Sequence, residues 1–169
     1  MKRRLMEVQV NISQFKNPQA FAQAIQNGML GVAEAIRADF KATTITWKHK
    51  PRFERRTKGF ADIEITTDDK IWVMLNYGTK PHLILPKPTN KTQRLRFRWD
   101  GFGSYGAKTK PNFLGSKAAR YPKTLVTRRM VRHPGTKARN WIVTAQTKWN
   151  KLMPARIQNA INAVAKKGV

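Results

Sequence analysis

The sequence contains no cysteine among its 169 residues. A disulfide framework, thiol chemistry and zinc sites with cysteine ligands are therefore excluded. Long hydrophobic runs are also missing, and no stretch approaches the roughly 18 apolar residues of a membrane-spanning helix. We therefore expect no association with a membrane. A chain of this length is expected to fold as one domain, residues 1–169, whose core needs neither disulfides nor a metal.

Acidic residues are scarce. Nine Asp and Glu stand against 34 Lys and Arg, which gives a formal net charge of +25. All nine acids lie at or before Asp100, and fifteen Lys and Arg follow it without a single acid. The C-terminal part therefore cannot hold a conventional acid–base active site. The excess charge also predicts that a polyanion or an acidic partner offsets the self-repulsion of the chain.

Two segments have the periodicity of amphipathic helices. Asn17 is a good N-cap and is followed by proline, so the apolar residues after it predict a helix over about 18–41. Thr136 is the candidate N-cap of a second helix over about 137–166, in which Pro154 should cause a kink or a split. The apolar positions are Phe21, Ile25, Met29, Val32, Ile36 and Phe40 in the first helix, and Trp141, Ala145, Trp149, Leu152, Ile157, Ile161 and Val164 in the second.

The rest of the chain favours strands and loops. Thr67–Lys70 is typical of a hairpin turn, and Arg94–Trp99 alternates arginine with apolar residues, as in a strand with one fully basic face. Residues 48–59 and an insertion at about 100–123 are expected to be basic loops. We therefore expect an α+β fold, with an antiparallel sheet of about four to six strands flanked by the two long helices. The predicted strands are 5–12, 43–48, 60–66, 71–77, 94–99 and 125–131.

Few residues are placed for catalysis or metal binding. His82 and His133 have no carboxylate within four residues, so hydrogen bonding in turns is favoured over zinc binding. The carboxylates between Asp62 and Asp69 could hold a divalent cation for phosphoryl transfer. A solvated strand face and hairpin tip are the favoured interpretation, and a nuclease that uses Asp62 and Glu64 remains an alternative. We expect no enzymatic activity, no catalytic residue, no cofactor and no metal.

Cationic residues interleave with aromatic residues, a pattern typical of nucleic-acid-binding surfaces. One cluster follows Trp47, a second lies on the predicted strand at 94–99, and the pattern continues to Arg132. Such stripes attract phosphates without reading a base sequence, and an acidic protein partner or simple solubility would also explain them. The residues expected to face DNA or a partner are Lys48, Lys50, Arg52, Arg55, Arg56, Arg94, Arg96, Arg98, Arg128, Arg129 and Arg132.

Two turn motifs stand about fifty residues apart. The first, NYGTKPH at 76–82, ends a predicted strand, and the second, VRHPGTKAR at 131–139, opens the second helix. Together with the first helix and the basic strand region, this order resembles the tail-component family of long-tailed bacteriophages, the neck or tail-completion proteins of the head–tail junction. The resemblance covers roughly residues 18–165. Its turn residues are Tyr77, Gly78, Thr79, Pro81, His82, His133, Pro134, Gly135 and Thr136.

The resemblance implies a structural virion protein without catalytic residues. Its subunits would form a homo-oligomeric ring, of six copies or alternatively twelve, at the neck, tail-completion or tail-terminator position. The ring would connect the head–tail connector to the tail-tube or terminator proteins, and genomic dsDNA would pass through it without sequence preference. Assembly in the host cytoplasm is expected, with the 100–123 insertion reaching an adjacent ring. The alternative is a sequence-tolerant nucleic-acid-binding protein that is not part of a virion.

Overall fold

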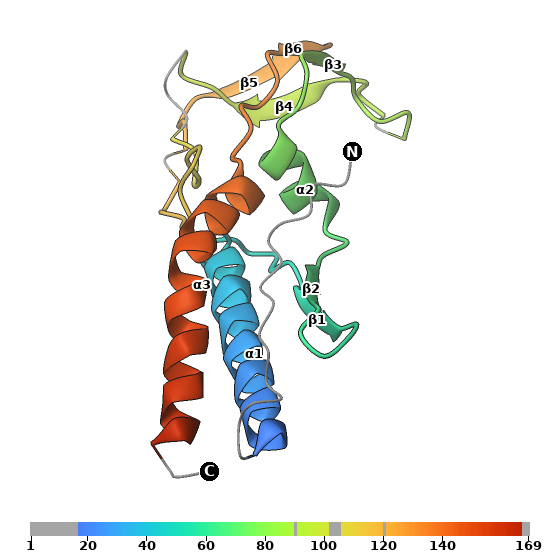
Figure 1. Cartoon of the computed structure of the whole chain (residues 1–169). Coiled ribbons are helices and arrows are strands. Elements are labelled where there is room, and N and C mark those ends of the chain that lie inside the picture. The colour runs from blue at the N-terminus through green and yellow to red at the C-terminus, as the bar shows by residue number, and fades with distance from the viewer. Residues whose placement is uncertain (1–16, 90, 102–105, 120, 167–169) are drawn as a thin grey trace.

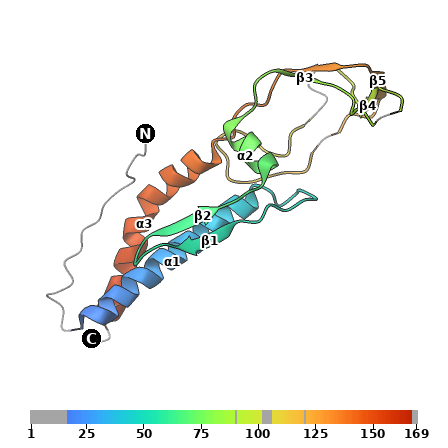
Figure 2. The ribbon, with the colours of Figure 1, turned by 90° about the vertical axis from the view of Figure 1, so that its right-hand side faces the viewer.

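The computed structural model describes residues 17–89, 91–101, 106–119 and 121–166, and the strand predicted at 5–12 lies outside these ranges. Two long antiparallel helices form a body, and paired strands extend beyond one end of it (Figures 1 and 2). Within the described ranges no helix has both the length and the apolar character needed to cross a bilayer. The elements are α1 (Pro18–Ala42), β1 (Glu54–Thr57), β2 (Ile63–Thr66), α2 (Lys70–Tyr77), β3 (His82–Ile84), β4 (Leu95–Arg98), β5 (Leu125–Arg128), β6 (Val131–His133) and α3 (Trp141–Ala165).

The predicted mixed α+β class and the first helix are confirmed. Asn17 Oδ1 accepts a hydrogen bond from the Ala20 amide at 3.0 Å, and a proline occupies the first helical position, as expected of an N-cap. The helix packs mainly on α3, which runs antiparallel beside it (Figure 1). Gly28 permits a close approach between the two helices, because a Cβ at this position would lie 3.3 Å from Ala160 Cβ.

An aromatic cluster forms the centre of the core. Phe40, Phe53, Trp72 and Trp141 are all buried, and their ring centroids lie between 5.2 and 5.7 Å apart in successive pairs. Trp72 and Trp141 are stacked. Each indole nitrogen has a partner, since Trp72 Nε1 donates to Thr43 Oγ1 and Trp141 Nε1 donates to the Phe113 carbonyl, both at 3.0 Å. The cluster therefore joins α1, α2, α3 and the chain before β1 without an unpaired indole N–H.

The predicted strand at 71–77 is wrong, because these residues belong to helix α2. Asp69 is the N-cap, and its Oδ1 accepts from the Trp72 amide at 2.7 Å, so the expected hairpin turn is a helix start. A continuous apolar run is compatible with either structure. The N-cap at Asp69 resolves the choice, and the buried residues of α2, Trp72 and Asn76, lie one helical turn apart on the face towards the core.

The predicted strand at 43–48 is also wrong, and a series of turns continues from α1 instead. The amides of Thr43, Thr44 and Trp47 each donate to the carbonyl three residues earlier. The hydroxyls of Thr43 and Thr44 donate to the carbonyls of Phe40 and Lys41. These side-chain bonds satisfy carbonyls at the end of α1, which overrides the strand preference of threonine.

The strands form three separate two-stranded ribbons and not the expected single sheet of about four to six strands. The antiparallel pairs are β1 with β2, β3 with β6, and β4 with β5. β1 lies within 48–59, which we predicted to be a loop, while β5 and β6 divide the strand predicted at 125–131. Because 43–48 forms turns and 71–77 forms a helix, these segments cannot bridge the ribbons into one sheet.

Helix α3 begins at Trp141 and not at about 137, and Thr136 is not its N-cap. The chain before it is held against α2, because the amides of Arg139 and Asn140 donate to the carbonyls of Leu75 and Asn76 at the end of α2. The Asn76 side-chain oxygen accepts from the Ile142 amide at 3.1 Å, while Asn140 itself makes no side-chain cap bond. α3 is not split by Pro154 and continues to Ala165.

We expect Asn76→Ala to lower the free energy of unfolding by about 1–3 kcal/mol, because Asn76 is 2% exposed and its loss leaves the partly buried Ile142 amide of α3 without an acceptor. Chemical denaturation measures the change. Asn159→Ala, at an exposed position of α3, is the control and should change the stability by less than about 0.5 kcal/mol. Equal losses in the two variants would contradict this capping role.

Candidate interaction surfaces

The two turn motifs meet in space and pair. The amide of Thr79 donates to the Thr136 carbonyl at 3.0 Å, and the amide of Thr136 donates to the Thr79 carbonyl at 3.1 Å. The same register continues into β3 and β6, where His82 lies opposite His133. We call the ribbons β3–β6 and β4–β5 the arm, which extends from this crossing away from the helical body (Figure 2).

Two glycines allow the strands to cross at this point. Gly78 and Gly135 have φ values of 78° and 86°, in the left-handed region that disfavours side chains. A Cβ on Gly78 would lie 2.6 Å from the Thr136 carbonyl oxygen, and a Cβ on Gly135 would overlap the Thr79 carbonyl oxygen. Each motif therefore needs its glycine because the backbone of the other motif occupies the space of a side chain.

The two motif histidines are packed together. The rings of His82 and His133 are 4.9 Å apart at an angle of 32°. Each ring is hydrogen-bonded to backbone within its own turn, as expected: His82 Nδ1 to the Lys80 carbonyl at 2.9 Å, and His133 Nδ1 to the Gly135 amide at 3.1 Å. A carbonyl only accepts and an amide only donates, so we assign the Nδ1 proton to His82 and an unprotonated Nδ1 to His133. In the described part of the chain, no group of three or more His, Asp or Glu is arranged to hold a metal.

The predicted alternation of Arg94–Trp99 is present in β4. Arg96 and Arg98 are exposed, while Leu95 and Phe97 are half-buried. Residues directly opposite each other in an antiparallel pair share a face. In this register Arg128 lies opposite Leu95 and therefore not on the face of Arg96 and Arg98. The predicted continuous basic stripe is thus divided between the two faces of the ribbon.

Asp100 closes the far end of the arm. Its carboxylate accepts hydrogen bonds from the amides of Lys123 and Thr124, the latter at 2.6 Å, and the Trp99 amide donates to the Thr124 carbonyl at 2.7 Å. Hydrogen bonds from Thr124 and Lys123 lower the pKa of Asp100 below its ordinary value, because they favour the ionised carboxylate. Asp100, the last acidic residue of the sequence, therefore has a structural role.

The cations of the body form a second group beside β1. Arg55 pairs with Glu34 at 2.9 Å and Arg56 pairs with Glu54 at 3.1 Å, while Lys50 Nζ donates to the Thr44 carbonyl at 3.1 Å. These three cations are committed to the chain itself, although exposed pairs contribute little stability. The other predicted cations, all exposed, are Lys48 and Arg52 in this group and Arg94, Arg96, Arg98, Arg128, Arg129 and Arg132 on or beside the arm, where Arg98 and Arg128 also donate to backbone carbonyls.

Part of the 100–123 insertion is fixed on the body. Its described central segment, 106–119, is anchored by Lys108 Nζ, which donates to the Thr46 carbonyl at 2.8 Å, and by the Asn112 amide, which donates to the Arg139 carbonyl at 2.8 Å. The Phe113 carbonyl accepts the Trp141 indole bond described above. This segment therefore belongs to the wall of the core, whereas we expected a free basic loop.

The acidic residues weighed for phosphoryl chemistry are dispersed or paired. Glu64 pairs with Lys58 at 2.9 Å, and Asp69 caps α2 and bonds His49 Nε2 at 2.8 Å. Asp62 and Asp68 are exposed. The described residues therefore provide no pair of free carboxylates directed at a common point, which is what a two-metal nuclease site requires.

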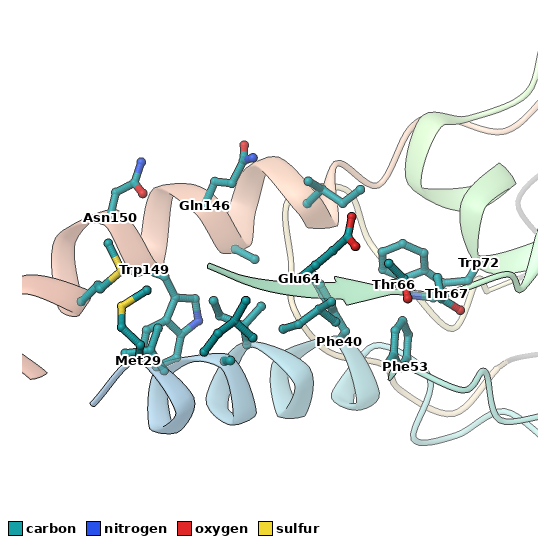
Figure 3. A pocket seen from close by; sticks show the side chains of 18 of the residues that line it. Met29, Phe40, Phe53, Glu64, Thr66, Thr67, Trp72, Gln146, Trp149 and Asn150 are labelled. Carbon is teal, nitrogen blue, oxygen red and sulfur yellow. The ribbon is translucent and has the colours of Figure 1, made fainter. Parts of the chain in front are cut away.

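The structure also contains an apolar groove that we did not predict from the sequence. Its volume is about 670 Å³, and it lies between α1, α3 and β2, as Figure 3 shows for Met29, Glu64 and Trp149. No sequence signal could have located it, because its lining comes from elements far apart in the chain. The residues of α1 and α3 that line it are Met29, Val32, Ala33, Ile36, Phe40, Ile142, Ala145, Gln146, Trp149, Asn150 and Met153.

Comparisons with models of protein families, with curated proteins and with solved structures find no match to this chain.

We expect Gly135→Ala to lower the melting temperature, because it adds a side chain at positive φ and pushes away the backbone at Thr79. The free energy of unfolding should fall by at least about 1–2 kcal/mol. Gly31→Ala is the matched control. It lies inside α1 with no atom within 4 Å of an added Cβ, so it should stabilise the protein by about 0.5–1 kcal/mol. Thermal unfolding of both variants checks the pair, and a Gly135→Ala protein as stable as the wild type would contradict the tight crossing.

Proposed function

We propose that this protein is a structural subunit of a tailed-phage virion, forming a ring at the head–tail junction around the DNA channel. The position is that of a neck, tail-completion or tail-terminator protein, between connector and tail tube. The main support is the pairing of the two turn motifs on which the resemblance rests. Residues 76–82 and 131–139, about fifty positions apart, meet at one crossing through two backbone hydrogen bonds. The motifs therefore form one structural unit, which orients the arm on the body.

Unsatisfied strand edges support assembly into a ring. Each described ribbon has two strands, so every strand has one edge without a partner strand among the described residues. A lone two-stranded ribbon is marginally stable in water, and exposed edges pair readily with other chains. The arm also exposes large apolar side chains, including Leu83, Leu125 and Met130. Contact with a neighbouring copy would bury these side chains and pair the edges, and ring closure leaves no edge open.

Exposed cations on the arm favour a polyanion such as DNA as the partner of the proposed ring. Arg96 and Arg98 lie exposed on one face of β4, and no acid follows Asp100 in the chain. In a ring these charges are repeated in every subunit, which favours DNA in or beside the channel without sequence preference. The same cations favour the second candidate, a sequence-tolerant nucleic-acid-binding protein outside a virion, which needs no ring.

We expect the purified protein to form closed rings, detected by sedimentation velocity and negative-stain microscopy. Leu83→Asp and Leu125→Asp should each weaken assembly at least about tenfold, because they place a charge in an apolar contact between copies. Leu152→Asp, at an exposed leucine of α3 away from the arm, is the matched control and should leave the rings intact. A protein that stays monomeric at all concentrations and binds DNA tightly would favour the second candidate instead.

Removing two arm arginines should change how DNA binding responds to salt. The double variant Arg96→Gln, Arg98→Gln should reduce the slope of log K against log salt by about 1.8, since each phosphate contact contributes about 0.9. Arg55→Gln, Arg56→Gln removes the same charge, but its guanidinium groups are already paired with Glu34 and Glu54. Fluorescence anisotropy with a mixed-sequence duplex measures both slopes, and equal reductions would show that the arm has no special part in DNA contact.

A further inference from the structure

One wall of the apolar groove is an edge of β2 that has no partner strand among the described residues. Five consecutive residues, Ile63–Thr67, line the groove, whereas β1 contributes none of its own residues. Side chains in a strand alternate between the two faces, so a consecutive lining run means that the edge of β2 itself borders the groove. Figure 3 shows β2 above α1, with α3 along the opposite side. The groove therefore lies where a further strand would pair with β2.

The register of β1 and β2 shows which amides face this edge. The backbone amide of Lys58 donates to the Asp62 carbonyl at 2.8 Å. From this pair, hydrogen-bonded pairs recur at every second position of the antiparallel ladder. The amides of Glu64 and Thr66 thus point to β1. The amides of Ile63 and Ile65 point away from β1, towards the groove, where an added strand would accept their hydrogen bonds.

We infer that residues 5–12 of the same chain bind in this groove as a strand, antiparallel to β2. In this segment Met6, Val8, Val10 and Ile12 alternate with Leu5, Glu7, Gln9 and Asn11. A strand at the edge of β2 would place its apolar set on the floor that α1 provides and its mostly polar set towards solvent. The ribbon β1–β2 thereby becomes a three-stranded sheet, which is more stable than a lone two-stranded ribbon.

The chain can reach this position without strain. The α1 residues that line the groove run from Met29 to Phe40, which is up to about 33 Å from Pro18 at 1.5 Å per helical residue. Residues 5–17 span up to about 40 Å when extended. α1 and β2 both run towards α2 (Figures 1 and 2), so a segment that precedes α1 and lies along it runs opposite to β2. A tethered segment also binds at an effective concentration in the millimolar range.

Amide exchange in the full-length protein, followed by NMR, tests this inference. The amides of Ile63 and Ile65 should be protected in the wild type, and Val8→Asp, Val10→Asp should accelerate their exchange by about tenfold or more, because a charged face cannot lie on α1. The control Gln9→Asp, Asn11→Asp adds the same charge on the opposite face of the same segment and should leave the protection in place. In every variant the amides of Glu64 and Thr66 report that the β1–β2 ribbon is intact.

Two outcomes would overturn the inference. The first is unprotected Ile63 and Ile65 amides in the wild type or equal acceleration by the two double variants, either of which shows that 5–12 does not cover this edge. The second is protection that declines on dilution, which would assign the strand to a neighbouring copy. The measurement needs only folded subunits, so failure here leaves the ring proposal standing, and failure to form rings leaves this inference standing.

Discussion

Two hydrogen bonds between Thr79 and Thr136 determine where the distal half of this molecule lies. The bonded residues follow Gly78, which ends α2, and Gly135, which precedes the chain into α3. Both strands of β3–β6 start from this pair, and β4–β5 continues beyond it. The arm has none of the large residues of the aromatic core, so its orientation depends on this backbone contact. The space between the chains is too small for a Cβ on either glycine.

In the body, contacts between α2 and the start of α3 hold the two chains that enter this crossing. Carbonyl groups at the end of α2 accept amides from residues before α3, and the Asn76 side chain caps α3 in return. Stacking of Trp72 on Trp141 holds the same two helices together from within the core. The two helices that hold the aromatic rings therefore also carry the two chains of the crossing.

Charge and incomplete pairing are the two features from which the proposed ring is argued. A chain with a net charge of +25 repels copies of itself unless anions or neighbours offset the charge. Ribbons with open edges and exposed leucines gain stability from neighbours. A ring around DNA satisfies both needs, whereas a free nucleic-acid-binding protein satisfies only the first. His49, His82 and His133 and most of the described carboxylates have local partners in the chain.

Local patterns predicted some elements well. The cap at Asn17, the helical spacing through Phe40 and the arginine alternation in β4 depend on neighbours in sequence, so the sequence alone was enough. The two glycine motifs were also recognisable as turns, although their mutual contact was not. The segments at 43–48 and 71–77 were mistaken for strands because threonines and apolar runs suit both structures. The choice was made by the hydroxyl bonds to the end of α1 and by the Asp69 cap with its buried Trp72 face.

By itself, the sequence determined the two long helices, the basic face of β4, the absence of thiol chemistry and the surplus of positive charge, since each depends on composition or on short-range periodicity. Only the tertiary structure decided that the strands form three ribbons, that the two motifs cross, that the cations separate into two groups and that a groove opens beside β2. These features depend on contacts between residues tens of positions apart, for which a single sequence holds no local signal.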